Sequence, residues 1–486
     1  VVLLKKIRRD QLLQSSQTKL RFATQQRTGV RPTMNQSTPG SDLAGIENAT
    51  ILERDNHPIS RKQISPNAVK VLYKLAEAGY HGFLVGGGVR DLLLGKSPKD
   101  FDIATDASPE QLKSLFRNAR IIGRRFKIIH LSFGREIIEV TTFRAPHDSE
   151  NKIDDNVPRR RIQNQESAHS TAGMILRDNV YGNIDEDALR RDFTINALYY
   201  TIDKFRILDF STGLDDLESK QIRMIGDPAE RYKEDPVRML RAIRFAAKLG
   251  FTIEEKTEKP INELAHLLES ISTARLFDET IKLMTGGDAK KTFELLRRYR
   301  PGDYLFAPTF RALDKLSGPP CKLVELALKN TDGRLAEGKS VTPAFLFAAL
   351  LWPVLQLRLE AQKSNEGNQH QLFQQAAQDV LMEQLQYTAV PKRFTIAAKE
   401  IWELQSRLMR DNKRGIEGSF GHPRFRAAYD FLLLREEAGE DLGGRGEWWT
   451  QFQLGDTSQI IQRASTEPDQ AKKRRRRRRP KPKTEG

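Results

Sequence analysis

Cysteine is nearly absent from this chain of 486 residues, in which Cys321 is the single example. One thiol excludes an internal disulfide and any metal site that needs several thiolates, and it is typical of a reducing compartment such as the cytoplasm. Long apolar runs are also missing, because Pro353 interrupts the most apolar stretch, residues 344–355. A helix that spans a bilayer needs about 20 apolar residues. The sequence therefore predicts a cytoplasmic protein without a membrane segment.

Histidine is scarce as well, and none of the eight histidines stands beside a plausible nucleophile motif. Ser-His-Asp and Cys-His mechanisms therefore find no support. Positive charge is in excess, with a formal net charge of +16. Residues 1–33 hold eight Lys/Arg and one Asp, and residues 472–486 hold ten Lys/Arg and one Glu, so the two ends account for the whole excess. Such basic ends indicate a nucleic-acid partner.

The ends of the chain differ from its middle in pattern. Residues 1–60 are polar and aperiodic, so we expect a disordered leader. Within it, residues 1–33 are either similar to an organellar transit peptide or an extension upstream of Met34, and we favour the second interpretation. In residues 257–436 apolar residues recur at helical spacing, and no segment has a convincing strand pattern. Residues 437–471 are expected to be a linker before a polybasic tail.

Short strands alternate with helices between the leader and the helical part. The polar residues 145–180 lack periodicity and are expected to form an exposed flap. Together these patterns predict a mixed α/β domain followed by an all-α body. The expected strands are 83–85, 101–103, 128–133, 137–143, 198–202 and 206–210, and the expected helices are 67–78, 89–94, 187–196 and 235–249.

Two carboxylates stand two positions apart in the run from Lys99 to Ile103. Successive side chains of a strand point to opposite faces, so Asp100 and Asp102 are expected on one face, while Phe101 points into the core. Two like charges at one point repel each other unless a cation lies between them. Mg²⁺ prefers such hard oxygen ligands, completed by the phosphates of a substrate. The sequence therefore predicts a site for a metal and a triphosphate.

A run of three glycines, residues 86–88, precedes this pair of aspartates. Glycines form a tight turn between a strand and a helix, and they also allow backbone amides to approach a phosphate. Arg90 adds a forked donor shortly after the turn. The glycine turn, the arginine and the two carboxylates lie within a short segment, which favours a functional site over a surface loop.

The residues around these features resemble the nucleotidyltransferase family that includes bacterial poly(A) polymerases and CCA-adding enzymes. Segments 84–102, 190–200 and 234–245 carry the resemblance in order, and it is strong over residues 60–260. It implies an α/β domain of the polymerase β type with a mixed sheet, an all-α body and disordered termini. The implied domains are a catalytic domain, neck helices that bind nucleotide and RNA, an RNA-binding body, and a linker with a polybasic tail, at residues 61–210, 211–270, 271–440 and 441–486.

The resemblance also implies roles in the catalytic domain. Asp100 and Asp102 would be catalytic and would bind two Mg²⁺ ions. Asp192 would be a further catalytic acid, although a buried ion pair that holds a helix is an alternative role for it. Glu139, on a strand expected beside that of Asp100, is a rival third carboxylate. The implied contacts with the incoming ATP are Gly87, Arg90 and Arg191.

Three arginines recur at every third position of the helix that follows Pro236. The opposite side of this helix is apolar, which would pack the helix and turn the arginines toward a partner. The resemblance implies that Asp235 and Arg238 read the base edge of the nucleotide and that Arg241 and Arg244 help to position it. A carboxylate accepts hydrogen bonds and a guanidinium donates them, so side chains can select a base without a template.

The reaction implied by the resemblance is AMP transfer from ATP to RNA 3′ ends, with in-line attack, two metal ions and release of pyrophosphate, in RNA polyadenylation and decay. The alternative is a CCA-adding tRNA nucleotidyltransferase. Poly(A) polymerase is favoured because Gly123–Phe126 resembles that branch and because a polybasic tail suits long heterogeneous RNA. The residues predicted to bind RNA are Arg124, Arg125, Arg474, Arg475 and Arg476.

Overall fold

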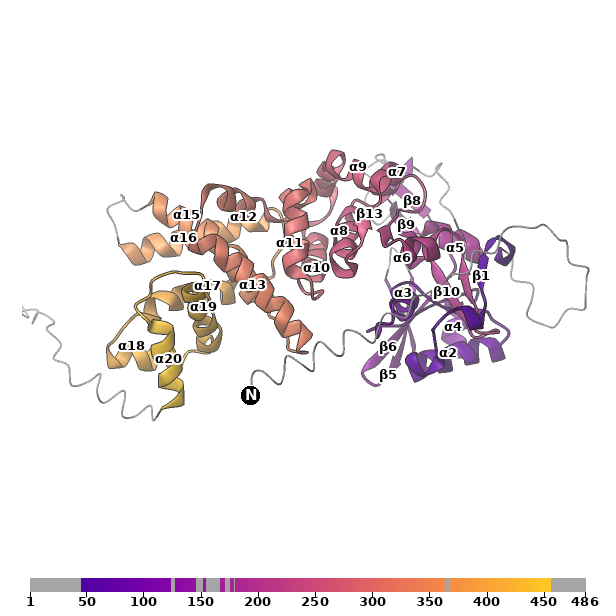
Figure 1. The fold of residues 1–486 in the computed structure, drawn as a ribbon, viewed down its shortest axis with the longest axis horizontal. Coiled ribbons are helices and arrows are strands. Elements are labelled where there is room, and N and C mark those ends of the chain that lie inside the picture. The colour runs from indigo at the N-terminus through magenta and orange to yellow at the C-terminus, as the bar shows by residue number, and fades with distance from the viewer. Residues whose placement is uncertain are drawn as a thin grey trace, which may run out of the picture. The chain divides into compact units, whose positions relative to one another are not determined.

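The computed structural model of the chain describes residues 45–123, 127–145, 152–153, 167–170, 175–178, 180–362 and 368–455. The chain divides into two compact units, with the boundary between Asp227 and Pro228, later than the expected end of the catalytic domain at residue 210. The first unit, the head, contains a sheet with helices, and the second unit, the body, is helical (Figure 1). The predicted fold class is confirmed.

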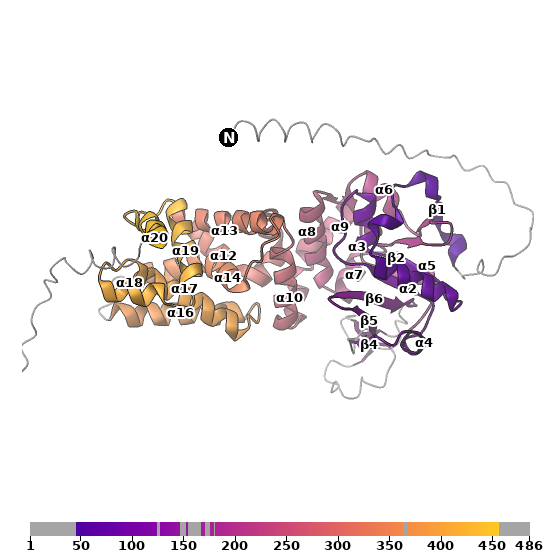
Figure 2. The same ribbon diagram turned by 90° about the horizontal axis from the view of Figure 1, so that it is seen from below.

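One mixed sheet of eight strands organises the head. The strands are β1 (Thr50–Leu52), β2 (Gly82–Val85), β3 (Asp102–Thr105), β4 (Ala119–Ile122), β5 (Ile128–Phe133), β6 (Glu136–Thr142), β10 (Leu198–Thr201) and β11 (Ile207–Asp209). Their spatial order is β1-β11-β10-β2-β3-β6-β5-β4, and only β3 and β6 run parallel in this sheet. Figure 2 shows β6, β5 and β4 following one another at one edge.

Helices and short turns connect these strands. Their bounds are η1 (Ile46–Asn48), η2 (Arg54–Asn56), η3 (Arg61–Gln63), α2 (Pro66–Glu77), α3 (Gly87–Leu93), α4 (Pro109–Leu115), α5 (Ile184–Arg190), η5 (Thr194–Asn196) and α6 (Gly213–Glu218), with the short strand β12 (Gln221–Ile222). The first predicted helix is α2, which begins at a Ser65 cap with proline in its first turn. The glycine turn is followed by α3, also as predicted.

The two faces of the sheet are covered differently. Leu72 and Leu75 of α2 pack against Gly82, where a Cβ atom would lie 2.9 Å from Leu75 Cδ1. On the other face, Ile184 and Ala188 of α5 join a buried cluster with side chains of β2, β3, β10 and β11. That cluster covers only half of the second face. The half formed by β3, β6 and β5 carries polar side chains, and the candidate site lies there.

The described residues 45–60 differ from the predicted leader. Residues 50–52 form β1, which pairs antiparallel with β11 at the sheet edge, and His57 and Ile59 are buried. The expectation of a disordered leader over residues 1–60 is therefore wrong for residues 45–60. A three-residue edge strand carries no recognisable alternation, because its stability comes from the pairing with β11 rather than from its own sequence.

Three other local predictions differ from the structure. The strand expected at 101–103 begins at Asp102, and the helix expected at 187–196 ends at Arg190, before the separate turn η5. The expected flap contains a three-stranded sheet of β7 (Lys152–Ile153), β8 (Ser167–Ser170) and β9 (Ile175–Asp178). The expected linker contains a helix, α20, whose Trp449 and Phe452 are buried against neighbouring helices.

The body is a series of helices, as the periodicity of residues 257–436 predicted. Among the described helices, none is by itself long and apolar enough to cross a membrane, and only the bent pair α14 and α15 meets that test when taken together. The elements are α7 (Pro228–Glu234), α8 (Val237–Leu249), β13 (Thr252–Ile253), α9 (Glu255–Glu263), η6 (Ala265–Ser270), α10 (Thr273–Met284), α11 (Ala289–Arg298), η7 (Arg300–Gly302), α12 (Asp303–Lys315), α13 (Pro319–Ala336), α14 (Pro343–Leu350), α15 (Trp352–Ala361), α16 (Gln369–Leu385), α17 (Lys392–Leu408), α18 (Lys413–Phe420), α19 (Phe425–Glu437) and α20 (Arg445–Leu454).

Candidate active site

The two aspartates of the predicted metal site lie at the start of β3. Asp102 is the first residue of the strand, whereas Asp100 precedes it in an exposed loop. Phe101 and Ile103 are buried, as the alternation predicted. The pKa of Asp102 is raised to about 6, mainly by burial and then by the charges of Glu139 and Asp100, while Arg191 opposes them. The charge of Asp100 therefore lies within electrostatic reach of Asp102.

Glu139 is the side neighbour of Asp102 in the sheet. β3 and β6 pair in parallel, and their register places Asp102 opposite Glu139. This confirms the expected neighbouring strand. On its other side Glu139 faces His130 of β5, with Nε2 and Oε1 3.3 Å apart. A row of three polar side chains thus lies across the half of the sheet that the buried cluster does not include, namely Asp102, Glu139 and His130.

The donor set fits a cation that arrives with a nucleotide. Among the described residues, no group of three or more His, Cys, Asp and Glu side chains could hold a metal ion by itself. Mg²⁺ needs only one or two carboxylates when phosphates and water supply its other ligands. The pKa of Asp102 is raised first by burial and then by the charges of Glu139 and Asp100, so a cation that approaches Asp102 would meet negative charge from more than one carboxylate. Asp100 and Asp102 are therefore suited to Mg²⁺ bound together with a triphosphate.

The raised pKa predicts that the charge on Asp102 lowers the stability of the metal-free protein. The pKa is about 6 in the fold against an ordinary 3.8, so the folded state binds the proton more tightly. The destabilisation is present above pH 6 and disappears as the pH falls toward 4. In a chelator at pH 7.5, Asp102→Asn should raise the free energy of unfolding by about 1 to 3 kcal/mol. Urea titrations at pH 7.5 and pH 4 measure this difference, and equal stability at pH 7.5 would contradict it.

The glycine turn brings Asp102 and Arg191 together. Gly86 has a φ of 72°, a left-handed conformation that favours glycine. A Cβ atom on Gly86 would lie 3.7 Å from Arg191 Nη1 and 3.9 Å from Asp102 Oδ2. A Cβ atom on Gly88 would lie 3.4 Å from the Asp100 carbonyl oxygen. The backbone of the turn therefore lies beside both the Arg191 guanidinium and the Asp102 carboxylate.

Hydrogen bonds from Arg191 to Tyr199 and Asp187 hold its guanidinium group in place. Its Nε donates to Tyr199 Oη at 2.8 Å and its Nη2 to Asp187 Oδ2 at 3.0 Å, while Tyr199 Oη donates to the same Asp187 oxygen at 2.6 Å. Burial lowers the pKa of Arg191, but Tyr199 and Asp187 raise it more strongly, so the guanidinium stays charged. Burial raises the pKa of Tyr199 well above its ordinary value. Tyr199 and Asp187 were not singled out from the sequence.

Arg90 and Asp192 belong to one buried network. Arg90 donates twice to Asp91 Oδ1, at 2.9 and 2.7 Å, and once to Asn196 Oδ1, at 2.6 Å. Asn196 Nδ2 donates to Asp192 Oδ1 at 3.2 Å, and the backbone N–H of Phe193 donates to the same oxygen at 2.8 Å. This network ties α3 to η5. It gives Arg90 and Asp192 structural contacts, and a structural role is the alternative that the sequence left open for Asp192.

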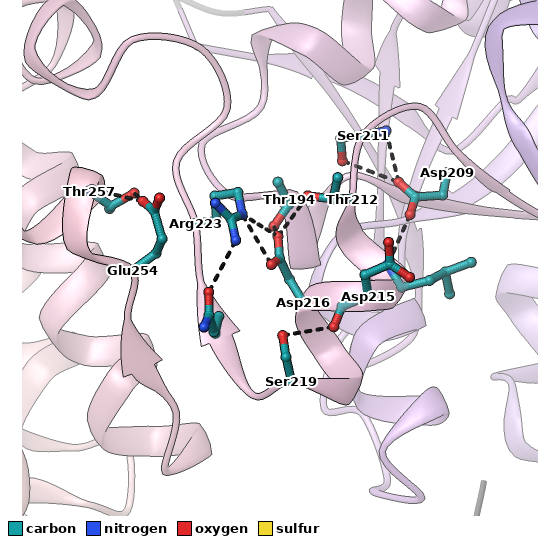
Figure 3. Close-up of polar contacts among 12 residues, drawn as sticks. Thr194, Asp209, Ser211, Thr212, Asp215, Asp216, Ser219, Arg223, Glu254 and Thr257 are labelled. Atoms are coloured by element: carbon teal, nitrogen blue, oxygen red, sulfur yellow. Dashed lines mark hydrogen bonds and ion pairs between the residues drawn. The ribbon is translucent and has the colours of Figure 1, made fainter. Parts of the chain in front are cut away.

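A second buried carboxylate supports η5 from below (Figure 3). Asp216 Oδ2 accepts hydrogen bonds from Thr194 Oγ1 at 2.7 Å and Thr212 Oγ1 at 2.9 Å, and Arg223 Nε lies 3.1 Å away. Nearby, Asp209 closes the turn after β11 by accepting from the backbone of Leu214. The contact between Thr194 and Asp216 joins residues 22 positions apart, whereas the other contacts are local to the turns after β11 and α6.

In the body, only one carboxylate oxygen of Asp235 has a hydrogen-bond partner among the described residues. Its Oδ2 accepts from Arg275 Nη2 of α10 at 2.7 Å, whereas its Oδ1 is buried without a hydrogen-bond partner among the described residues. Arg238 Nη1 donates to Glu234 Oε2 at 2.6 Å and to the Arg231 carbonyl oxygen at 2.7 Å. Arg275, Arg231 and Glu234 were not predicted, because each acts through a non-adjacent partner.

The arginine stripe of α8 is not a solvated face. Arg238, Arg241 and Arg244 are each half-buried, and burial extends around most of the helix, beyond the single apolar face expected. The guanidinium carbons of Arg241 and Arg244 lie 5.4 and 5.0 Å from the ring centre of Phe245. Five further predicted residues lie outside the described ones, namely Arg124, Arg125, Arg474, Arg475 and Arg476.

Three families match successive parts of the chain. They are the Poly A polymerase head domain at residues 82–223, the probable RNA and SrmB-binding site of polymerase A at 250–313, and the polymerase A arginine-rich C-terminus at 365–483. The chain is 46% identical to Poly(A) polymerase I of Escherichia coli O6:H1 over 448 residues, 90% of this chain and 93% of that protein. The CCA-adding enzyme of Lactobacillus helveticus is 38% identical over 228 residues, 47% of this chain and 52% of that enzyme.

Solved structures show the same fold. The Bacillus stearothermophilus CCA-adding enzyme in complex with CTP has a TM-score of 0.53 at 24% identity, covering 81% of this chain and 83% of that one. At this identity the likeness concerns the fold alone. The similarity to poly(A) polymerases runs through nearly the whole chain, whereas that to the CCA-adding enzyme of L. helveticus covers about half, so the CCA-adding alternative is not favoured. The chain belongs to the bacterial poly(A) polymerase I family and is a nucleotidyltransferase.

Proposed function

We propose that this polymerase transfers AMP from ATP to RNA 3′-hydroxyl ends, releases pyrophosphate, and thereby acts in RNA polyadenylation and decay. The observation that carries the proposal is the meeting of Asp102, Arg191 and the Gly86 turn at one point of the head. Such a point offers carboxylates for Mg²⁺, a fixed cation for phosphate and a backbone that allows close approach.

Asp100 and Asp102 are the residues that would hold two Mg²⁺ ions. When bound, these ions lower the pKa of the attacking 3′ hydroxyl and neutralise the leaving pyrophosphate. Glu139 is the third carboxylate in this proposal, because it neighbours Asp102 in the sheet while an oxygen of Asp192 already accepts two hydrogen bonds. Asp192 then acts by holding Asn196, and through it Arg90.

Arg191 binds the triphosphate in this proposal, supported by Gly87 and Arg90 of the turn. Its two fixed hydrogen bonds mean that it loses little conformational entropy when the nucleotide binds. Because the pKa of Arg191 is raised, its charge is available at every working pH. This charge compensates the negative charge that develops on the phosphates during transfer.

Asp235 and Arg238 select the base. The Watson–Crick edge of adenine offers one amino donor and one ring-nitrogen acceptor, which match the unpartnered Oδ1 of Asp235 and a guanidinium donor of Arg238. Guanine and uracil present the opposite order and are rejected. Cytosine has the same order as adenine but is smaller, so the choice between ATP and CTP depends on the size of the pocket rather than on these two groups.

The function is tested by offering unstructured RNA, Mg²⁺ and each nucleoside triphosphate separately, and then tRNA that lacks its CCA end. We expect a long ladder with ATP alone. A stop after C-C-A on the tRNA would identify a CCA-adding enzyme instead. Extension of equal length with all four nucleotides would contradict base selection, and no extension at all would contradict the proposed activity.

Removing one hydroxyl should loosen Arg191. Tyr199→Phe deletes the hydroxyl that accepts from Arg191 and donates to Asp187, while the direct contact between Arg191 and Asp187 remains, so we expect the KM for ATP to rise by about tenfold, with a smaller change in kcat. Tyr200→Phe is the matched control, since Tyr200 is also buried but belongs to the opposite face of the same strand. Steady-state kinetics at saturating RNA measure both variants. An unchanged KM in Tyr199→Phe would show that Arg191 does not need support from the Tyr199 hydroxyl.

The polybasic tail and the pair Arg124 and Arg125 bind RNA in this proposal. Deleting residues 472–486 removes ten basic residues. RNA affinity should fall, and the slope of its logarithm against the logarithm of salt concentration should flatten by about 0.7 for each phosphate contact that is lost. Nucleotide choice should not change. Anisotropy titrations in a salt series measure the slope, and a switch of preferred nucleotide would contradict this division of roles.

A further inference from the structure

A cavity of about 400 Å³ lies at the turn between α17 and α18 in the body. Three arginines, Arg407, Arg410 and Arg414, line it together with Asn412, Gly415, Gly418 and Ser419. Within the described part of the chain, none of the three guanidinium groups forms an ion pair or a hydrogen bond. We call this cavity the arginine pocket. Its three guanidinium groups thus have no paired counter-charge among the residues between 45 and 455 that the structure describes.

The one acidic residue within the turn, residues 407–414, already has a cation of its own. Residues 407–414 contain four basic residues and a single carboxylate, Asp411. Arg445 of α20 donates from Nη1 to Asp411 Oδ1 at 2.6 Å, so this carboxylate has its own cation. The charge of the three lining arginines therefore remains available for a ligand.

The turn that carries the arginines is held in place by α20. The C-terminal carbonyl groups of a helix carry partial negative charge, which would repel an anion. Here Arg445 Nε donates to the Leu408 carbonyl oxygen at 2.6 Å, Arg445 Nη2 donates to the Arg410 carbonyl oxygen, and Trp449 Nε1 donates to Leu408 at 2.9 Å. Trp449 is itself fully buried. These bonds occupy the carbonyls and fix the position of Arg410.

Two glycines keep the pocket open. A Cβ atom on Gly415 would lie 2.6 Å from Asn412 Oδ1 and 3.0 Å from Arg410 Cβ, so a side chain there would push against the lining. Nothing lies within 4 Å of a Cβ atom on Gly418, which faces open space. The lining contains no apolar or aromatic side chain. The pocket thus offers donors without a surface for stacking or for apolar burial.

We propose that the arginine pocket binds a backbone phosphate of the RNA substrate, as a second anchoring point besides the catalytic head. Guanidinium forks match phosphate oxygens in geometry and charge. The absence of an aromatic lining makes this recognition independent of base, as a polymerase for heterogeneous RNA requires. An acidic segment of a partner protein would fit the arginine pocket less well. Protein interfaces have an apolar centre, and the lining of the pocket contains no apolar side chain. The proposal rests on the proposed action on RNA.

The first test removes two charges from the full-length chain. Arg410→Gln combined with Arg414→Gln should lower the affinity for a labelled unstructured RNA by about tenfold at low salt and reduce the salt slope by about 0.7 to 1.4. The control combines Lys392→Gln with Arg393→Gln, the same change of charge at the other end of α17. Affinity of the control should stay within about twofold of the parent. If both double variants lost RNA affinity equally, or if the Arg410→Gln, Arg414→Gln variant lost none, the proposed phosphate site would be wrong.

The second test fills the pocket without removing an arginine. Gly418→Glu and Gly418→Gln add side chains of equal size into open space, so both variants should unfold at similar temperatures. Only the glutamate should weaken RNA binding, by about tenfold, because its carboxylate occupies the guanidinium groups. Equal weakening by the glutamine would contradict a phosphate site.

Two further comparisons separate the ligands. Inorganic phosphate at millimolar concentration should compete with RNA in the parent and not in the double arginine variant. If that variant bound RNA as the parent does but no longer bound a polyglutamate peptide, the pocket would belong to an acidic protein partner and the proposal would be wrong. RNA binding is measured without ATP, so a chain that binds RNA through the pocket but adds no AMP would refute the proposed activity alone.

Discussion

Asp102→Asn is expected to reduce AMP incorporation at least about a thousandfold, because the loss of a metal ligand removes several kcal/mol of transition-state stabilisation. Asp100→Asn should have a similar effect. RNA affinity should change by less than about twofold, since neither carboxylate neutralises phosphate charge. Single-turnover extension of a labelled RNA with ATP and Mg²⁺ measures the rate, and anisotropy measures the binding.

Loss of folding cannot account for the expected result, because Asp102→Asn should stabilise the metal-free protein at neutral pH. Asp106→Asn is the matched control. Asp106 follows the other end of β3 and accepts a hydrogen bond from the backbone N–H of His81 at 2.9 Å, a contact that asparagine preserves. Normal activity is expected in this control. Normal activity in either Asp100→Asn or Asp102→Asn would disprove the assignment of the metal site.

Asp235→Asn should have the second large effect, on nucleotide choice. The substitution replaces a buried acceptor by an amide that also donates, which no longer excludes the carbonyl groups of guanine and uracil. We expect kcat/KM for ATP to fall by about a hundredfold and the preference for ATP over GTP to shrink by a similar factor. Competition between the two labelled nucleotides on one RNA primer measures the preference directly.

Arg275 provides the control for this prediction. Arg275→Lys keeps a cation beside Asp235 but loses the forked geometry that holds Oδ2. A carboxylate that is less firmly held should still accept from adenine, so the loss in kcat/KM should be smaller, with ATP still preferred. If Asp235→Asn retained the full preference for ATP, the base would be read by other groups.

Local patterns predicted much of the head correctly. The glycine turn and the strands around 83–85 and 128–133 depend on neighbouring residues, whose spacing is visible in one sequence. The failures occur where pairing with distant residues decides the structure. β1 exists because it pairs with β11, and α20 exists because Trp449 is buried among α17 and α19.

The predicted site residues show the same division. The sequence predicted roles for Asp102, Arg90 and Arg191, but it did not indicate that Arg90 is tied to Asn196 or that Tyr199 and Asp187 hold Arg191. These contacts join α3, α5, η5 and β10. Asp187 and Arg191 are four positions apart, so helical spacing could have indicated that pair, whereas the contact between Arg90 and Asn196 spans 106 residues and forms only in the folded head.

By itself, the sequence determined the family, the chemical types of the reactive groups and the order of helices and strands, because these depend on short motifs and on periodicity. Only the tertiary structure decided that Glu139 lies beside Asp102, that one oxygen of Asp235 lacks a partner, and that Arg407, Arg410 and Arg414 face one cavity. Strand register and helix packing set those distances, and both result from burial shared among residues that are far apart along the chain.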